Sequence, residues 1–441
     1  MASKKVAKKA PKKTTPVIPG DTGTKKEKRT TGLPTAASVT VVSNSAGVTL
    51  PRELPAKDRE MKLGALKNEL GDLLVSADQA STPYMVRRPT GIMELDIALG
   101  GGFPAGGPCV VGGPFNSGKT WLMWRTLAMQ QAIYGSNFVG AIANTETPLD
   151  YWQARKAGAV ISMPDEVLNQ QAEYRRQRGT PDFTSEEIYN LKYQIGHIEL
   201  IHGRTGEEIL TGILKFNESR VCSFIAIDSI NGLQPEVDSG KDLDEADKMA
   251  AQAMMMKRFW MHYVPQVRGG RNYTTLYLTQ QAVSNTDKAN APSYVKKYLR
   301  DWELKGGEST KHHSLVTLYL WSGEKIKLPN YQDAVGKYVN YLTKKGKAGT
   351  HDNLTGEFPF YYHIGGVDIH GELIASAVRR NVLVYHNNRI QLVNGTNREP
   401  IEGWWVPNEQ ALRDVLMHDF DFELAIRREV LASAGVECLY R

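Results

Sequence analysis

The sequence feature that most restricts the fold of this chain is a loop signature at residues 113–120. These residues read Gly-Pro-Phe-Asn-Ser-Gly-Lys-Thr and match the pattern G-x-x-x-x-G-K-[ST]. At average composition, the four fixed positions coincide in about one chain in a hundred of this length. An apolar run at 109–111 precedes the loop, and a run with helical character at 121–127 follows it. The sequence therefore predicts a strand, a phosphate-binding loop and a helix in succession, as in α/β proteins.

The fixed positions of this loop each have a chemical reason. Glycines let backbone N–H groups approach phosphate oxygens at a helix N-terminus, whose dipole favours anions. Lys119 would reach the β- and γ-phosphates, and the Thr120 hydroxyl would ligate Mg²⁺. ATP and Mg²⁺ are therefore the expected cofactors. The candidate nucleotide-binding residues of the loop are Gly113, Pro114, Phe115, Asn116, Ser117, Gly118, Lys119 and Thr120.

Two carboxylates are candidates for the rest of a catalytic site. Residues 224–227 form an apolar run that ends at Asp228, which places a carboxylate at the carboxyl edge of the sheet, where it would hold Mg²⁺ or its water. Glu146 follows another expected strand at 138–142, and hydrolysis needs a group that orients or deprotonates the attacking water. From spacing alone, Glu146 is either that base or a solvated loop carboxylate.

The positive charge of the chain is concentrated at one end. The net charge is +6, but residues 1–30 contain ten of the 54 Lys and Arg residues and two of the 48 acids. The remainder holds 44 cations and 46 acids, a balance of −2. This excludes a uniformly basic nucleic-acid coat protein. The basic tail is a solvated flexible end, a targeting signal or a nonspecific DNA-binding arm.

The cysteines and the hydropathy pattern indicate the cellular compartment in which the protein is expected. Cys109, Cys222 and Cys438 lie far apart, so neither a disulfide framework nor a structural zinc site is expected, and a reducing compartment fits. The chain has no run of eighteen apolar residues, and no membrane partner is expected. The N-terminus lacks the apolar segment of a secretory signal. We therefore expect a cytoplasmic protein.

Composition and periodicity divide the chain into four expected parts. Residues 1–50 are expected to be a disordered basic tail, because they bury too little apolar surface. Residues 51–85 are expected to form a helical element that packs on its own domain or on a neighbouring subunit. Residues 86–355 alternate strands and helices, with a charged helical insertion of no assigned function at about 162–195. Residues 356–441 are expected to form a small α+β domain. The apolar stripe of the helical element consists of Met61, Leu63, Leu66, Leu70, Leu73 and Leu74.

These residues, in this order, resemble the RecA-type recombinases, including phage members of the UvsX kind, from roughly Thr90 to Val430. Residues 90–106 are similar to the lead-in to the family's phosphate loop, and residues 365–373 are similar to the entry into its C-terminal domain. The resemblance implies a RecA-like ATPase core with a central, mostly parallel twisted sheet. It also implies self-association into a filament, with ATP bound at the subunit interfaces.

The resemblance also implies roles for residues near the nucleotide. Residues 144–156 are similar to the segment with the family's catalytic glutamate, which makes Glu146 the water-activating base and Asp150 a contact of the adenine base. The family's aromatic residue three positions further on is Gln153 here. Residues 276–280 resemble the strand that ends in a glutamine sensing the γ-phosphate, which is Gln280 in this chain.

A basic cluster further along the chain resembles the pair of residues that reach the nucleotide of the adjacent subunit. Lys344 fits the first position of this pair. Lys345 and Lys347 compete for the second position, because the spacing differs by one residue. The resemblance therefore predicts a nucleotide site completed by two subunits.

Two loops are candidates for DNA contact. The first, at about 234–248, is locally acidic, and only the resemblance assigns Lys248 a phosphate contact. The second, at 281–307, has five basic residues against three acids up to Lys305, with aromatic residues four positions apart among them. Cations and stacking aromatic rings suit a single-strand groove, although the pattern also fits a small amphipathic helix. The candidate DNA-binding residues are Lys248, Lys288, Lys296, Lys297, Arg300 and Lys311.

The sequence with its resemblance predicts an ATP- and DNA-dependent recombinase that forms filaments on single-stranded DNA and exchanges homologous strands. Duplex DNA, single-strand-binding proteins and mediator proteins are the further partners expected. A nucleoid-associated location fits, including that of a phage-encoded protein in its bacterial host. The alternatives are a ring-forming replicative helicase with the same core and a nucleotide-switched DNA-coating protein without strand exchange. The segments at 90–106 and 365–373 disfavour the helicase.

Overall fold

A computed structural model of the chain provides the architecture, and it separates into two units, Met1–Ala65 and Leu66–Arg441. The expected tail at 1–50 lies outside the described residues. The first described element is helix α1 (Ala56–Leu70), on which Met61 and Leu63 are 70% and 46% exposed. The structure describes residues 56–71, 83–146, 150–161, 165–185, 187, 196–236, 245–268, 272–284, 302–304, 307–329, 332–387, 389–393 and 400–437.

The second unit is built on a mostly parallel sheet, as the sequence predicted. Its strand order is β11-β10-β9-β3-β7-β6-β4-β5, and β8 pairs with β7. The pairs from β9 through β3, β7, β6 and β4 to β5 are parallel, whereas β10 pairs antiparallel with both β9 and β11. The strands are β3 (Gly107–Gly113), β4 (Val139–Asn144), β5 (His197–Leu200), β6 (Phe224–Asp228), β7 (Thr275–Ser284), β8 (Trp302–Leu304), β9 (Val316–Ile326), β10 (Gly336–Gly346) and β11 (Thr355–Tyr361).

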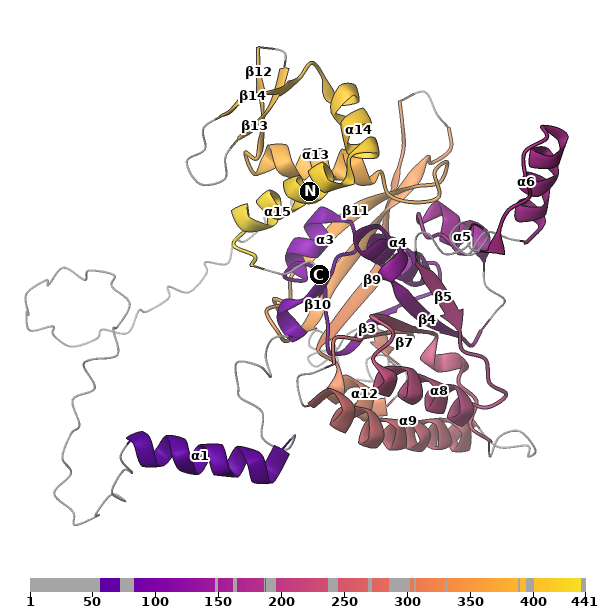
Figure 1. The fold of residues 1–441 in the computed structure, drawn as a ribbon, viewed down its shortest axis with the longest axis vertical. Coiled ribbons are helices and arrows are strands. Elements are labelled where there is room, and N and C mark those ends of the chain that lie inside the picture. The colour runs from indigo at the N-terminus through magenta and orange to yellow at the C-terminus, as the bar shows by residue number, and fades with distance from the viewer. Residues whose placement is uncertain are drawn as a thin grey trace, which may run out of the picture. The chain divides into compact units, whose positions relative to one another are not determined.

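Helices cover both faces of this sheet (Figure 1). Because both faces are covered, central strands read as continuous apolar runs, and all of β6 except Asp228 is buried. On one face Trp124 is fully buried in a cluster with Tyr277 of β7, and on the other Phe259 and Trp260 pack with Leu276 and Leu278. Complete burial of one such large side chain contributes roughly 1.5–3 kcal/mol. The covering helices are α3 (Met93–Ala98), α4 (Lys119–Tyr134) and α5 (Tyr151–Lys156) on the first face, and α8 (Gly206–Ser219), α9 (Glu245–Arg268) and α12 (Gly307–His313) on the second.

Shorter elements complete the core. In the described part of the predicted insertion, helix α6 (Asp165–Gln177) has mostly exposed side chains. The guanidinium of Arg176 on this helix pairs with the Asp182 carboxylate at 2.8 Å. Of the described helices, none combines the length and apolar character needed to cross a membrane. The remaining short elements are β1 (Arg87–Arg88), β2 (Phe103–Pro104), η2 (Gly135–Asn137) and η3 (Ile230–Gly232).

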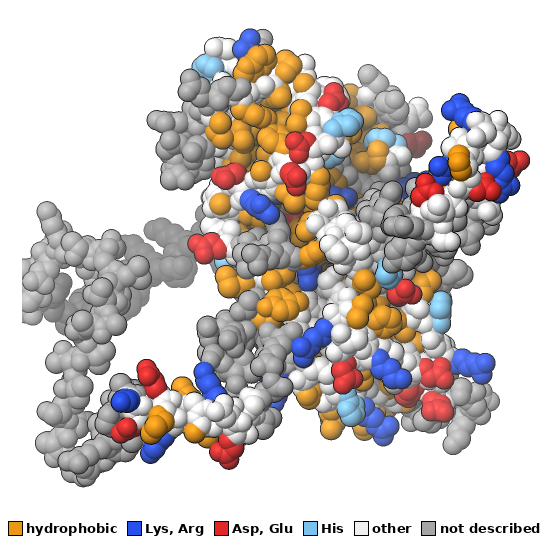
Figure 2. All heavy atoms as spheres, viewed as in Figure 1, with side chains coloured by type: hydrophobic (Ala, Val, Ile, Leu, Met, Phe, Trp, Pro, Cys, Tyr) orange, Lys and Arg blue, Asp and Glu red, His pale blue; other side chains and the backbone are white. Residues whose placement is uncertain are grey.

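The C-terminal part has its own three-stranded antiparallel sheet, in the order β12-β13-β14, and its own apolar cluster. Hydrophobic side chains gather on the face over this sheet (Figure 2), and Tyr385 and Trp405 are exposed. Met93 of α3 is buried in the same cluster as Leu373 and Ile426, so the core and the C-terminal part share apolar contacts. Its elements are α13 (Ile369–Arg379), β12 (Leu383–His386), β13 (Arg389–Val393), β14 (Pro400–Val406), α14 (Glu409–His418) and α15 (Phe420–Ser433).

A buried ionic network also joins α3 to the C-terminal part. The Glu372 carboxylate accepts hydrogen bonds from the backbone N–H groups of Met93 and Glu94, at 2.7 and 3.0 Å, where α3 begins. Asp96, also on α3, is completely buried and accepts from the backbone and hydroxyl of Thr90 at 2.7 and 2.8 Å. Arg427 of α15 is completely buried and is the main cation facing these carboxylates.

Candidate active site

The predicted phosphate-binding loop lies between the carboxyl end of β3 and the N-terminus of α4. Gly118 caps α4 with φ 94°, a left-handed conformation that side chains disfavour, and Asn116 also has a positive φ of 56°. A Cβ on Gly113 would collide with the carbonyl oxygen of Leu320 on β9. The loop therefore needs glycine at both fixed positions, and it presents backbone N–H groups at a helix N-terminus.

Lys119 folds back over this loop. Its Nζ donates to the carbonyl oxygens of Gly113 and Pro114 at 3.0 and 2.8 Å. Burial lowers the pKa of Lys119, and the carboxylates of Asp228 and Glu146 act in the opposite direction. The ammonium and the helix N-terminus together concentrate positive charge where the loop would hold a triphosphate.

Thr120 and Asp228 lie side by side at the ends of α4 and β6. The Thr120 hydroxyl donates to Asp228 Oδ2 at 2.7 Å, and the Thr279 hydroxyl donates to Asp228 Oδ1. Burial raises the pKa of Asp228, against the hydrogen bonds from Thr279 and Thr120 that lower it. One hydroxyl and one carboxylate next to a phosphate loop fit Mg²⁺, which keeps several waters and takes substrate phosphate oxygens as further ligands.

Glu146 follows β4, which pairs in parallel with β6 so that Asn144 lies opposite Asp228. Its side chain is exposed, and its Oε1 accepts hydrogen bonds from the Ser229 hydroxyl and, at 2.9 Å, from Gln281 Nε2. The carboxyl ends of parallel strands meet at one edge of a sheet. That edge therefore brings together the predicted residues Lys119, Thr120, Glu146 and Asp228.

Gln280 and Gln281 lie on opposite faces of β7, because side chains alternate along a strand. Gln280 shares its face with Leu278, is buried, and has no hydrogen-bond partner for its amide among the described residues. Gln281 shares its face with Thr279 and contacts Glu146. The sequence analysis missed Gln281, Ser229 and Thr279, and alternation along the apolar strand is the signal that could have suggested Gln281.

The other predicted nucleotide residues lie on neighbouring elements. Asp150 caps α5 and accepts hydrogen bonds from the backbone N–H groups of Trp152 and Gln153 at 2.9 and 3.1 Å. Trp152 is 72% exposed. Lys344 lies near the end of β10, with its Nζ 5.3 Å from the ring centre of Tyr319. Adenine contact by Asp150 and trans contact by Lys344 stay predictions.

Few of the candidate DNA-binding residues fall within the described structure. Lys311 lies on α12, where its backbone carbonyl accepts from Lys345 Nζ at 2.6 Å. Lys248 lies on α9, but its side chain is outside the described residues. The remaining candidates, all in the second loop, also lie outside the described residues: Lys288, Lys296, Lys297 and Arg300.

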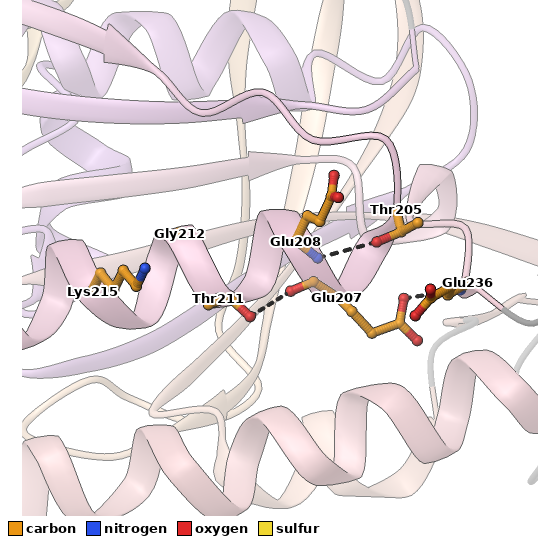
Figure 3. A pocket seen from close by; sticks show the side chains of 7 residues that line it. All are labelled: Thr205, Glu207, Glu208, Thr211, Gly212, Lys215 and Glu236. Atoms are coloured by element: carbon orange, nitrogen blue, oxygen red, sulfur yellow. Dashed lines mark hydrogen bonds between the residues drawn. The ribbon is translucent and has the colours of Figure 1, made fainter.

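The start of the first candidate DNA loop is attached to the N-terminus of α8 (Figure 3). The Glu236 N–H donates to the Glu207 carboxylate at 3.0 Å. The Gly206 N–H donates to the Gln234 carbonyl at 2.7 Å. Thr205 caps the same helix by accepting from the backbone N–H of Glu208 at 3.2 Å. These contacts fix where the loop leaves the core, while residues 237–244 lie outside the described part.

A second lysine contacts the phosphate loop. Lys337, at the start of β10, donates from Nζ to the carbonyl oxygen of Asn116 and, at 2.9 Å, to the Ser322 hydroxyl. The Ser322 hydroxyl itself donates to Asn116 O at 3.3 Å. Burial lowers the pKa of Lys337. The β9–β10 hairpin thus supports the loop at the residue with positive φ, a contact that the sequence analysis did not predict.

Replacing Lys337 with Ala should weaken ATP binding about threefold to tenfold, because the loop loses a charge-assisted support at Asn116. Equilibrium titration with a fluorescent ATP analogue measures this change. Lys325→Ala is the matched control, since Lys325 is exposed, pairs with Lys337 across the hairpin and has the same charge. Equal weakening by both variants would mean that only the charge of the hairpin matters.

The fold and this site define a class of protein: a P-loop nucleoside-triphosphate-binding protein with an α/β core. No protein-family model matches the chain. Curated relatives include Protein RecA of Citrifermentans bemidjiense, 23% identical over 337 residues that cover 76% of this chain and 84% of the relative. Protein RecA of Bdellovibrio bacteriovorus is 23% identical over 384 residues, 86% of each chain, and that of Cereibacter sphaeroides is 27% identical over 331 residues, 74% and 81%. Over about three quarters of its length or more, the chain is therefore similar to proteins named RecA, at 23–27% identity.

Proposed function

We propose that this protein is a DNA-dependent ATPase that forms filaments on single-stranded DNA and catalyses homologous pairing and strand exchange. One observation carries the proposal. Lys119, Thr120, Glu146 and Asp228 converge at one edge of the sheet, and β7 reaches that edge and ends within the first residues assigned to the second candidate DNA loop. The similarity of the chain to proteins named RecA supports the same proposal.

Each residue of this site has a separate role in the proposed hydrolysis of ATP. The loop N–H groups and Lys119 would bind the phosphates, while Thr120 and Asp228 would hold Mg²⁺, which would supply positive charge to stabilise the transferred phosphoryl group. Glu146 takes a proton from water as the water oxygen bonds to the γ-phosphorus. The bond from the γ-phosphorus to the bridging oxygen breaks, ADP keeps that electron pair, and inorganic phosphate leaves.

Subunit and DNA contacts belong to the same proposal. Lys344, with Lys345 or Lys347, would reach the nucleotide of the adjacent subunit, so ATP binding would stabilise the filament. Gln280 would sense the γ-phosphate, as the family pattern implies. The two loops would bind single-stranded and duplex DNA along the filament axis, and single-strand-binding and mediator proteins would act on that filament in the cytoplasm.

The proposal is tested by measuring ATP hydrolysis with and without single-stranded DNA, together with a strand-exchange assay. We expect single-stranded DNA to stimulate hydrolysis and homologous duplex to be converted into joint molecules. Electron microscopy with ATP and single-stranded DNA should show open helical filaments. Closed hexameric rings would identify the helicase instead. Hydrolysis no faster with DNA than without it would favour the nucleotide-switched coating protein.

A further inference from the structure

The carboxylate of Glu146 is held by one of its two oxygens. Oε1 accepts from the Ser229 hydroxyl and from Gln281 Nε2, the latter at 2.9 Å. Among the described residues, none donates a hydrogen bond to Oε2. The torsion that rotates a carboxylate is broad, so two donors on one oxygen fix an orientation that the side chain would not hold alone.

Both donors are themselves anchored. The Ser229 N–H donates to Thr145 Oγ1 at 3.0 Å, and the same hydroxyl donates back to the Ser229 carbonyl at 2.6 Å. The Gln281 N–H donates to Asn231 Oδ1 at 2.9 Å. Ser229 is also buried, at 1% exposure. The two donors therefore have defined positions before any ligand binds.

Gln281 lies on the face of β7 whose side chains contact both Glu146 and Asp228. Two residues earlier on the same face, Thr279 donates to Asp228. Three residues later β7 ends at Ser284, so residues 281–284, which the sequence analysis assigned to the second candidate DNA loop, belong to the strand. The family pattern points to Gln280 instead, but the amide of that residue lies on the opposite face of the strand.

We propose that Gln281 and Ser229 are positioning residues that hold Oε1 of Glu146 and so direct Oε2 toward the attacking water. This inference rests on the proposed ATPase function. The two residues act through Glu146, and neither needs to touch the nucleotide.

Gln281→Glu and Gln281→Ala in the full chain test the proposal. Misplacing a catalytic group by about 1 Å costs on the order of a hundredfold in rate, so kcat should fall about tenfold to a hundredfold, with and without DNA. The KM and Kd for ATP should stay within about twofold, because the side chain of Gln281 donates to Glu146, and it is the backbone of Gln281, unchanged by the substitution, that pairs with Gly113 of the phosphate loop. Gln410→Ala, which changes an exposed glutamine of α14, is the matched control.

Two further readouts separate positioning from simple packing. Gln281→Glu keeps the size of the side chain but loses the N–H donor and places a second carboxyl against Glu146 Oε1, so its kcat should fall at least as far as that of Gln281→Ala. In a Glu146→Gln background, Gln281→Ala should cause no additional loss of kcat. Ser229→Ala should lower kcat with KM unchanged, and thermal melting checks that each variant is folded.

Wild-type kcat in both Gln281 variants would overturn the inference, as would a loss that follows Gln280→Ala and not Gln281→Ala. The outcome for the proposed function is separate. Wild-type hydrolysis that DNA does not stimulate would contradict the DNA-dependent ATPase, while a loss of that basal kcat in Gln281→Glu would still support positioning of Glu146.

Discussion

Glu146→Gln should abolish ATP turnover and leave ATP and DNA binding intact. The glutamine has the same shape, and its carbonyl oxygen can still accept from Ser229 and Gln281. It cannot take a proton from water, and loss of a general base typically lowers a rate by a factor of about 10²–10⁴. Steady-state hydrolysis gives kcat, and titration of ATP and of single-stranded DNA gives the two binding constants.

The control for this variant is Glu324→Gln, which removes the same charge from an exposed glutamate on the β9–β10 hairpin. It should hydrolyse ATP like the wild type. Loss of ATP binding in Glu146→Gln would contradict the role assigned to Glu146, because the residue would then be part of the binding site. An unchanged kcat would assign the base to another group.

Arg427→Ala should destabilise the second unit by about 3–5 kcal/mol, the typical effect of removing one partner from a buried ionic group. Arg427 is completely buried, and its Nε and Nη2 contact Glu423 Oε1 at 2.8 and 2.7 Å. Its charge also acts on Asp96, which is completely buried, and on Glu372, which is partly buried. Without it, carboxylates in a dry region lose their main cation. Urea unfolding followed by circular dichroism measures the loss.

The destabilisation by Arg427→Ala should shrink as pH falls. Burial alone would raise the pKa of Glu423, but the hydrogen bond from His370 and the charge of Arg427 outweigh it and lower that pKa to about 2. A lowered carboxyl pKa adds stability above its unfolded value of 4.5, and that stability is lost as pH falls toward 2. Arg427→Ala removes the part of this contribution that comes from Arg427. In acid, protonation of Glu423 removes that contribution from the wild type as well, so the difference in stability between the two proteins narrows.

The net shift is opposite for Asp96, because burial raises its pKa to about 7 and outweighs the hydrogen bonds from Thr90 and the charge of Arg427, which lower it. Between 3.8 and about 7 the folded state binds this proton more tightly, so this contribution to stability decreases as pH rises. Arg379→Ala is the control, because Arg379 pairs with Glu94 on the surface with its side chain 65% exposed. It should cost at most about 1 kcal/mol. Equal losses in both variants would contradict the assigned role of Arg427.

Much of the fold followed from local patterns. The phosphate loop, the apolar run before Asp228 and the alternation of strands and helices are each visible in short stretches, because backbone conformation and burial impose them residue by residue. The long antiparallel pairing of β10 with β9 and β11 was harder to foresee, since it depends on contacts across the sheet. It is this pairing that places Lys337 against the phosphate loop.

The sequence by itself determined the chemistry at the phosphate loop: glycines, Lys119 and Thr120 act within one turn of backbone, so their order along the chain is sufficient. Only the tertiary structure decided which groups face Glu146. Ser229 and Gln281 are 83 and 135 residues away along the chain, and pairing of β4 with β6 and of β6 with β7 brings them to one edge. Which of two adjacent glutamines reaches Glu146 depends on the face of β7 on which each lies, and strand pairing and burial set that face.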